Sequence, residues 1–217
     1  MRLKICGITE LAQAIAIAEL GVDTLGFICV ADSPRYLEAT RIQQITSKLP
    51  KQVSKIGVFV NQTVETIVTV LETAGLTGIQ LHGDETPSQC AQLREILPRV
   101  EIIKAFRYRD KKSLATLEEY LPYIDTILVD TYQKNVYGGT GKTLDWQQLR
   151  DFRPKRPWLL AGGLNADNIL LALQTVHCDG FDVSSGVEIS PGKKDLAKVR
   201  HLVSILNSYK SSLPSSN

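Results

Sequence analysis

Two side chains that can move protons lie where short apolar runs of the sequence end. Cys6 closes the run RLKIC, and Asp130 closes the run TILVD. Catalytic residues of α/β folds lie at the carboxyl ends of strands, so a thiol and a carboxyl at these positions are candidate site residues. The alternative for Cys6 is packing, because free cysteine is a small and readily buried hydrophobe.

Glycine clusters occur after three later runs, at GGTG (138–141), AGG (161–163) and SSG (184–186). Glycine lets backbone N–H groups approach an anion closely, and loops of this kind hold phosphate in many barrel enzymes. We therefore predict a phosphate site formed by Gly139, Gly141, Gly162, Gly163, Ser185 and Gly186. The alternative is that each glycine only serves a turn or a helix end. GGTGKT is not a nucleotide-binding P-loop, because position 136, where that motif needs glycine, is Val.

The composition excludes several function classes. The formal net charge is +2, from 25 basic and 23 acidic residues without a block of one sign, so we expect no nucleic-acid or membrane partner. The four cysteines and three histidines have no metal-ligand spacing, and no disulfide framework is indicated. The N-terminus has no cleavable signal pattern, and residues 11–31 read as helix, turn and strand rather than a membrane span. We expect a cytoplasmic protein without a bound metal.

The elements that must position these residues alternate along the chain. Eight β-rich runs occur at residues 2–8, 24–30, 54–60, 78–83, 101–107, 126–131, 158–164 and 180–187. Segments with helical spacing lie between them, and Thr86, Pro87 and Gln89 fit a capping box with proline at the first helical position. Such alternation predicts an α/β protein, a single-domain (β/α)8 TIM barrel over residues 1–210, with a disordered tail at 211–217.

In such a barrel, residues at the carboxyl ends of the strands face one mouth. This places Cys6 and Asp130 on different sides of the mouth, with room for a substrate between them. The other polar residues at strand ends are Arg35, His82, Arg107 and Asp182. His82 and Arg107 are not assigned to the site, and satisfying backbone groups at a strand end is one role open to each.

Seven motifs then stand in order along the chain: KICGIT (4–9), SPRY (33–36), QLHGDE (80–85), VDTY (129–132), YGGTGKTLDW (137–146), LAGGLN (160–165) and DVSSGVE (182–188). Together they resemble the phosphoribosylanthranilate isomerases of tryptophan biosynthesis, over residues 2 to about 205. The resemblance implies an Amadori rearrangement of N-(5-phosphoribosyl)anthranilate to 1-(2-carboxyphenylamino)-1-deoxyribulose 5-phosphate. It implies no cofactor and no metal.

The resemblance also implies roles for single residues. It gives Cys6 as the base, Asp130 as the acid and Arg35 as the partner of the anthranilate carboxylate. These roles require the pKa of Cys6 to fall and that of Asp130 to rise. Lys4 points inward by strand parity, so its charge could favour the thiolate; a structural ion pair with Asp182 is equally open. Asp182 is accordingly a substrate-binding residue or half of that pair.

The motifs depart from the family pattern in two places, at Cys29, Val30 and Ala31 and at Leu144. These departures concern the shape of the aromatic pocket and the packing of the loops, and neither involves a proposed catalytic atom. Other phosphosugar barrels, such as an epimerase or the histidine-pathway isomerase, remain rivals that would need a different acid and base. A phosphate-binding barrel without catalysis is a further alternative. The expected partner is a small phosphorylated substrate, with the chain acting as a monomer or homodimer.

Overall fold

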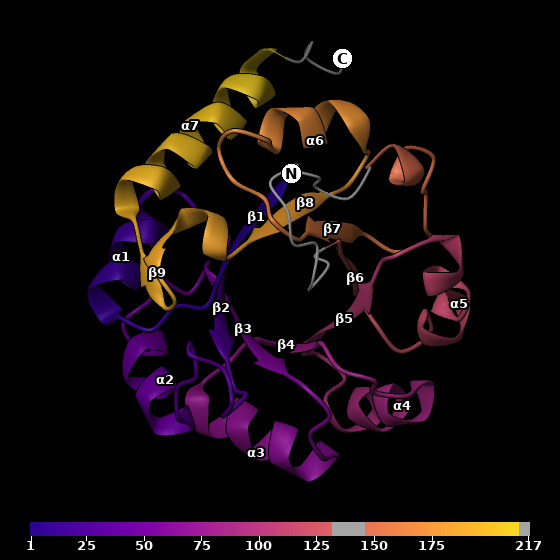
Figure 1. Cartoon of the computed structure of the whole chain (residues 1–217). Helices are drawn as coiled ribbons and strands as arrows, with labels where there is room; N and C mark the ends of the chain where they lie inside the picture. Colours follow the sequence, from indigo (N-terminus) through magenta and orange to yellow (C-terminus); the bar gives the residue numbers. More distant parts are fainter. Residues whose placement is uncertain (132–145, 213–217) are drawn as a thin grey trace.

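Eight parallel strands close into a barrel in the computed structural model, which describes residues 1–131 and 146–212. Figure 1 looks along the barrel axis, with the strands inside and the helices around them. The strands are β1 (Arg2–Cys6), β2 (Thr24–Ile28), β3 (Ser54–Phe59), β4 (Gly78–Leu81), β5 (Glu101–Arg107), β6 (Thr126–Asp130), β7 (Trp158–Ala161) and β8 (Gly180–Val183). β1 pairs with both β2 and β8, which closes the ring. The predicted (β/α)8 barrel is confirmed.

Strand alternation decides which side chains face the barrel interior. Successive Cβ atoms point to opposite faces of a strand. One set packs into a small inner cluster of Ile56, Ile103, Ala105, Leu128, Leu159 and Ala161, while the other set joins the larger core beneath the helices. On β1 the inward set is Lys4 and Cys6, which lie opposite Asp182 of β8 and Gly26 of β2. The register therefore brings charged and reactive groups to the axis.

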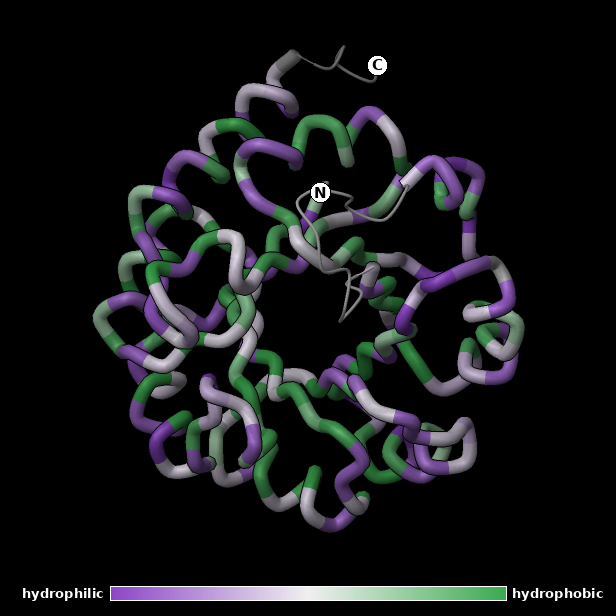
Figure 2. Tube along the Cα trace, in the orientation of Figure 1, coloured by the Kyte–Doolittle hydropathy of each residue, from purple (hydrophilic) through white to green (hydrophobic). Residues whose placement is uncertain are grey.

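The helices cover the outside of the barrel. They are α1 (Leu11–Glu19), α2 (Ala39–Thr46), α3 (Val64–Ala74), α4 (Pro87–Ile96), α5 (Leu117–Tyr120), α6 (Ile169–Thr175) and α7 (Leu196–Ser212), with short 3-10 helices η1 (Lys111–Leu114), η2 (Trp146–Leu149) and η3 (Ser185–Val187). In Figure 2 hydrophobic and hydrophilic residues alternate along these helices, as expected for helices with one buried face. None of the helices in the described ranges is long and apolar enough to cross a membrane.

The start of α4 is predicted correctly except for one hydrogen bond. Thr86 is the N-cap, its side chain accepts from the Gln89 backbone N–H at 3.2 Å, and Pro87 is at the first helical position. The Gln89 side chain, however, donates to the Gln62 backbone oxygen at 2.6 Å. It therefore ties the helix to the preceding loop instead of completing the capping box.

The chain after β8 adds an element that strand periodicity does not predict. β9 (Glu188–Ser190) and β10 (Lys193–Lys194) form an antiparallel pair, and Figure 1 shows β9 beside the mouth of the barrel, near α1. α7 then continues to Ser212, so residues 211 and 212 are helical rather than part of the predicted tail. The remainder of that tail lies outside the described residues.

Candidate active site

A cavity of ≈520 Å³ opens at the carboxyl ends of the strands. Residues from β1, β2, β3, β4, β6, β7 and β8 line it, together with residues of the loops after β2, β3, β4, β7 and β8. Of the predicted site residues, it brings together Cys6, Arg35, Asp130, Gly162, Gly163, Asp182 and Ser185. The argument from strand ends thus places most of the candidate residues around one space large enough for a small substrate.

The buried Cys6 thiol occupies space that is free because the neighbouring residue on β2, Gly26, has no side chain. A Cβ at Gly26 would lie 2.7 Å from the Cys6 Sγ and 3.0 Å from the Lys4 Nζ, so any larger residue there would displace the thiol. Burial raises the pKa of the Cys6 thiol, and Asp182 adds to this, while the charges of Lys4 and Lys194 oppose it without reversing it. The expected fall in the pKa of Cys6 is therefore wrong, because desolvation outweighs the two lysines.

Lys4 forms a buried ion pair with Asp182. Its Nζ lies 2.9 Å from both carboxylate oxygens, and its side chain has no exposed surface. Burial favours neutral Lys4, but Asp182 and Cys6 together outweigh it, so the pKa of Lys4 is raised. The Cys6 thiol contributes to this rise in the pKa of Lys4, so the two side chains interact. The structural ion pair expected as one alternative is therefore present, and it lies beside the thiol rather than apart from it.

Arg35 is held in place by residues from the far end of the chain. Its Nε and Nη2 donate to the two Glu188 oxygens at 2.9 and 2.6 Å. Lys194 donates to the same carboxylate at 2.8 Å and also to the Cys6 backbone oxygen at 2.5 Å. Burial opposes ionisation of Glu188, but Arg35 and Lys194 more than offset it and lower its pKa to about 2.

This network leaves part of the Arg35 guanidinium available. Arginine carries five N–H donors, and Glu188 takes the Nε–H and one donor on Nη2. Gly7, at φ +79°, lets the side chain pass, since a Cβ there would lie 2.6 Å from the Arg35 Cδ. Because its side chain lines the cavity, Arg35 can still present a two-pronged edge to a carboxylate.

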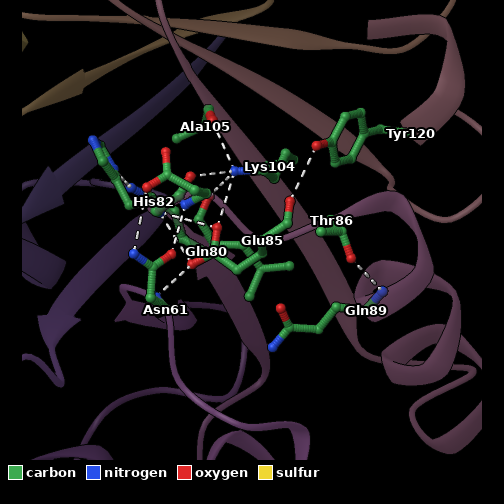
Figure 3. Close-up of polar contacts among 12 residues, drawn as sticks. Asn61, Gln80, His82, Glu85, Thr86, Gln89, Lys104, Ala105 and Tyr120 are labelled. Atoms are coloured by element: carbon green, nitrogen blue, oxygen red, sulfur yellow. Dashed lines mark hydrogen bonds and ion pairs between the residues drawn. The ribbon is translucent and has the colours of Figure 1, made fainter. Parts of the chain in front are cut away.

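Asp130 faces the cavity from β6 and lies next to His82. The His82 Nε2 is 3.2 Å from the Asp130 Oδ2, and the His82 Nδ1 is 2.8 Å from the Gln80 Nε2. Figure 3 shows Gln80 and His82 beside the network of Asn61, Glu85 and Lys104.

His82 contacts Asp130, a predicted catalytic side chain, through its ring. Its backbone oxygen also accepts a hydrogen bond from the Arg107 Nη2 at 3.3 Å. His82 therefore does more than satisfy backbone groups, the role that the sequence left open for it.

The predicted phosphate loops differ in what glycine does at each position. Gly162 and Gly163 have φ of +101° and +65°, and a Cβ at Gly163 would meet no atom within 4 Å, so glycine there serves the backbone conformation. A Cβ at Gly186 would lie 1.9 Å from the Leu164 backbone oxygen, so that glycine permits close packing of two loops. Gly139 and Gly141 lie outside the described residues.

Several residues of the site have no counterpart among the sequence predictions. Glu188 and Lys194 pair with partners that are more than a hundred residues away, and no local pattern encodes this. Gly26 gives a signal, because glycine inside a strand indicates close approach of another group. Gln80 gives one as well, since it shares the inward parity of His82. Among the positions that depart from the family pattern, Val30 lines the cavity and Leu144 lies outside the described residues.

The remaining ionisable groups of residues 1–131 and 146–212 form no group of three or more His, Cys, Asp or Glu that could hold a metal ion. The four cysteines are free thiols.

The fold and the cavity define the class of this site. It is a (β/α)8-barrel site in which a thiol and a carboxyl face one cavity, with glycine-containing loops at its rim.

Comparisons with known proteins agree with this class. The family model described as N-(5'phosphoribosyl)anthranilate (PRA) isomerase matches residues 3–205. An N-(5'-phosphoribosyl)anthranilate isomerase of Crocosphaera subtropica is 55% identical over 203 residues, covering 94% of this chain and 97% of the relative. The crystal structure of phosphoribosyl anthranilate isomerase from Thermotoga maritima is similar with a TM-score of 0.87 at 35% identity, covering 96% of this chain and 99% of the other.

A second solved structure contains a ligand. It is a phosphoribosyl anthranilate isomerase in complex with reduced 1-(o-carboxyphenylamino)-1-deoxyribulose 5-phosphate, similar with a TM-score of 0.82 at 34% identity and covering 96% of this chain and 99% of that chain. The chain belongs to the phosphoribosylanthranilate isomerase family, whose members are isomerases of tryptophan biosynthesis.

Proposed function

We propose that this chain converts N-(5-phosphoribosyl)anthranilate into 1-(2-carboxyphenylamino)-1-deoxyribulose 5-phosphate, with Asp130 as general acid and Cys6 as general base. The observation that carries the proposal is that these two side chains, from β6 and β1, line the same ≈520 Å³ cavity. They come from different sides of the ring, so a sugar between them can be protonated on one side and deprotonated on the other.

The first step opens the ribose ring. Asp130 gives its proton to the ring oxygen, the bond from that oxygen to C1 breaks, and the anthranilate nitrogen lone pair forms the C1–N double bond of a Schiff base. The His82 Nε2, 3.2 Å from the Asp130 Oδ2, can donate to the carboxylate that this step leaves behind. His82 thereby stabilises the product form of the acid.

The second step removes a proton from carbon. The Cys6 thiolate takes the proton on C2, and the C–H electrons form a C1–C2 double bond while the positive charge on nitrogen is neutralised. The resulting enolamine tautomerises to the ketone. Lys4 favours the thiolate that this step needs, since its ammonium lies against the thiol. The raised pKa of Cys6 means that the thiolate is the minor form at neutral pH.

The substrate is held at its two charged ends. Arg35 pairs with the anthranilate carboxylate through the donors that Glu188 leaves available. Backbone N–H groups near Gly162, Gly163, Ser185 and Gly186 bind the phosphate, together with Gly139 and Gly141. Asp182 contributes by holding Lys4 at the thiol, and because it lines the cavity it also contacts the substrate.

The reaction only moves protons within one molecule, so its balance requires neither a redox cofactor nor a metal. We expect an intramolecular aldose–ketose isomerase that acts in the cytoplasm on a small phosphorylated substrate, without nucleic-acid or membrane partners. The oligomeric state is expected to be a monomer or homodimer. A similar solved structure contains monomers generated from the phosphoribosylanthranilate isomerase of Thermotoga maritima, which is described there as dimeric.

The proposal is tested with freshly made phosphoribosylanthranilate, whose fluorescence is lost on rearrangement. Purified protein should cause loss much faster than spontaneous hydrolysis does, with formation of the deoxyribulose product. Asp130→Asn should reduce kcat by roughly 10²- to 10⁴-fold while the protein still binds substrate. Loss at the spontaneous rate would instead favour the barrel that binds phosphate without catalysis.

A further inference from the structure

Lys194 of β10 is a buried charged residue that the reaction scheme above does not use. Its side chain has no exposed surface, and its ammonium donates to three oxygens. These are the Glu188 Oε1 at 2.8 Å and the backbone oxygens of Cys6 and Ser184 at 2.5 and 3.4 Å. An ammonium carries three donors, so all of them are engaged. Lys194 therefore joins β9 to the backbone at the ends of β1 and β8.

The backbone oxygen of Cys6 lies where the pairing of β1 with β8 ends. The last paired residues are Ile5 and Val183, so Cys6 lies one position beyond them. There its oxygen accepts from the Lys194 Nζ and from the Ser184 Oγ, the latter at 3.1 Å. A buried backbone oxygen needs such partners where a strand no longer supplies them. Two side chains therefore hold the backbone of the proposed base.

The position of the Lys194 ammonium is itself fixed by its carboxylate partner. Glu188 also accepts from Arg35 at 2.9 and 2.6 Å and from the Gly192 backbone N–H at 3.2 Å. Glu188 would keep these bonds if Lys194 were removed. The effect of removing Lys194 should then fall on Cys6 rather than on the carboxylate.

The charge of Lys194 also acts on the Cys6 thiol. Burial raises the pKa of this thiol, and the Asp182 carboxylate adds to the rise. The ammonium groups of Lys4 and Lys194 act in the opposite direction. Lys4 lies against both carboxylate oxygens of Asp182, whereas Lys194 approaches from a different element, the β9–β10 pair. Lys194 is thus a second positive charge that favours the thiolate.

We infer that Lys194 is a positioning residue for Cys6: it holds the backbone of the proposed base at the mouth of the barrel and stabilises the thiolate by its charge. The inference rests on the proposed function, in which Cys6 removes the proton from carbon, and adds a residue to that step. Glu188 contacts both Lys194 and Arg35, so one carboxylate fixes the groups beside the base and beside the substrate carboxylate. A lysine that only stabilised the fold would change neither turnover nor the ionisation of the thiol.

The test compares Lys194→Met with the wild type. Methionine has a similar length but no charge and no N–H donor, and Glu188 keeps its bonds to Arg35 and Gly192, so we expect the variant to fold. We expect kcat for phosphoribosylanthranilate to fall by about 10- to 10²-fold, because displacing a reacting group by about 1 Å can cost that much. KM should change little, since Arg35 keeps both of its bonds to Glu188.

Alkylation of Cys6 by iodoacetamide measures the thiolate without using the reaction. Cys6 lines the cavity, and the thiolate is the form that reacts. At neutral pH, Cys6 of Lys194→Met should be alkylated roughly tenfold more slowly than in the wild type, as measured by mass spectrometry of the Cys6 peptide. A looser site alone would admit the reagent more easily and speed the alkylation, so slower alkylation reports the lost charge.

Lys104→Met is the matched control, because it also removes a buried lysine from a carboxylate pair but does not line the cavity. It should leave both kcat and the alkylation of Cys6 unchanged. Lys194→Gln is the second variant, which keeps an N–H donor without the charge; its Cys6 should also be alkylated more slowly, even where Lys194→Met fails to fold. Alkylation of Cys6 at the wild-type rate or faster in a folded Lys194 variant would overturn the inference, as would an unchanged kcat in Lys194→Met.

Wild-type turnover and the Cys6→Ser variant are measured alongside. If the wild type does not convert phosphoribosylanthranilate, or if Cys6→Ser converts it normally, the proposed function has failed. If both behave as proposed and Lys194→Met equals the wild type, only the inference about Lys194 has failed.

Discussion

Lys4 on β1 and Lys104 on β5 are both buried and both paired with a carboxylate, but they lie on opposite sides of the barrel wall. Lys104 points away from the inner cluster, toward the rings of Phe106 and Tyr120 at 5.7 and 5.9 Å. It donates to Glu85 at 3.0 Å and to the backbone oxygens of Gly83 and Ala105 at 2.9 and 3.1 Å. Figure 3 shows this network, with the Tyr120 hydroxyl bonded to the Glu85 backbone oxygen.

Lys4 has a different set of neighbours. Both of its carboxylate contacts go to Asp182, and its third contact is the Cys6 thiol. Asp182 and Cys6 line the cavity, whereas Lys104 and Glu85 do not. Burial and pairing with a carboxylate therefore do not distinguish the ion pair of the active site from the structural one. The difference is the Cys6 thiol, a titratable group that lies beside the Lys4–Asp182 pair and also lines the cavity.

The largest effect is expected for Cys6→Ser. Serine is nearly isosteric but far less acidic than a thiol, so the protein should fold normally and lose its base. We expect kcat to fall by roughly 10²- to 10⁴-fold, with the melting temperature little changed. Steady-state kinetics and a thermal melt on the same preparation measure both. Near-normal turnover with altered stability would return Cys6 to a packing role.

The pH profile of the wild type sharpens this prediction. A base acts in its deprotonated form, so kcat/KM should rise with pH while the thiol ionises. The profile of kcat/KM reports ionisations of the free enzyme. Burial raises the pKa of Cys6 above its ordinary value of 9.0, so kcat/KM should still be rising above pH 9.0. Cys6→Ser should lose this limb. A rise that is complete below neutral pH would show that another group sets it.

Lys104→Met should damage stability and leave chemistry intact. It removes the partner of Glu85, whose side chain has no exposed surface, and a buried charge left unpaired destabilises by about 3–5 kcal/mol. The control is Lys155→Met, in the exposed pair with Glu118, which should change the free energy of unfolding by about 0–1 kcal/mol. Urea unfolding measures both. A fall in kcat for a folded Lys104→Met protein would contradict this prediction, because it would show that Lys104, like Lys4, contributes to the reaction.

The sequence could predict those parts of the site that depend on local patterns or on neighbouring strands, but not those that depend on long-range packing. The runs that end in Cys6 and Asp130 are local, so strand alternation and barrel geometry were enough to place both at the mouth. The pairing of Lys4 with Asp182 followed from adjacent strands in the ring. The network of Arg35, Glu188 and Lys194 did not, because it depends on a two-stranded turn that packs back over the mouth. Its residues become neighbours only through the closed fold.

Gly26→Ala tests whether the space around the thiol matters as much as its charge. The added Cβ would lie 2.7 Å from the Cys6 Sγ, so the thiol must move, and displacement of a reacting group by 1 Å can reduce the rate by about 10²-fold. Gly57→Ala is the control. Its Cβ would meet Leu76 and Phe59 in the outer core, so it should lower stability and leave kcat unchanged. Equal kcat in the two variants would contradict the role given to Gly26.

The smallest effect is expected for Arg35→Lys, which keeps the charge but loses the planar fork. Lysine can satisfy neither the two-pronged bond to Glu188 nor a two-pronged bond to a carboxylate, so we expect KM for phosphoribosylanthranilate to rise about tenfold. A substrate analogue without the anthranilate carboxylate separates these two losses. It should bind wild type and variant with similar KM, because the interaction that distinguishes them is missing. An equal penalty for both substrates would mean that Arg35 acts by holding Glu188 and Lys194 in place, and the mouth would then resemble the closed Lys104 network more than a substrate-binding site.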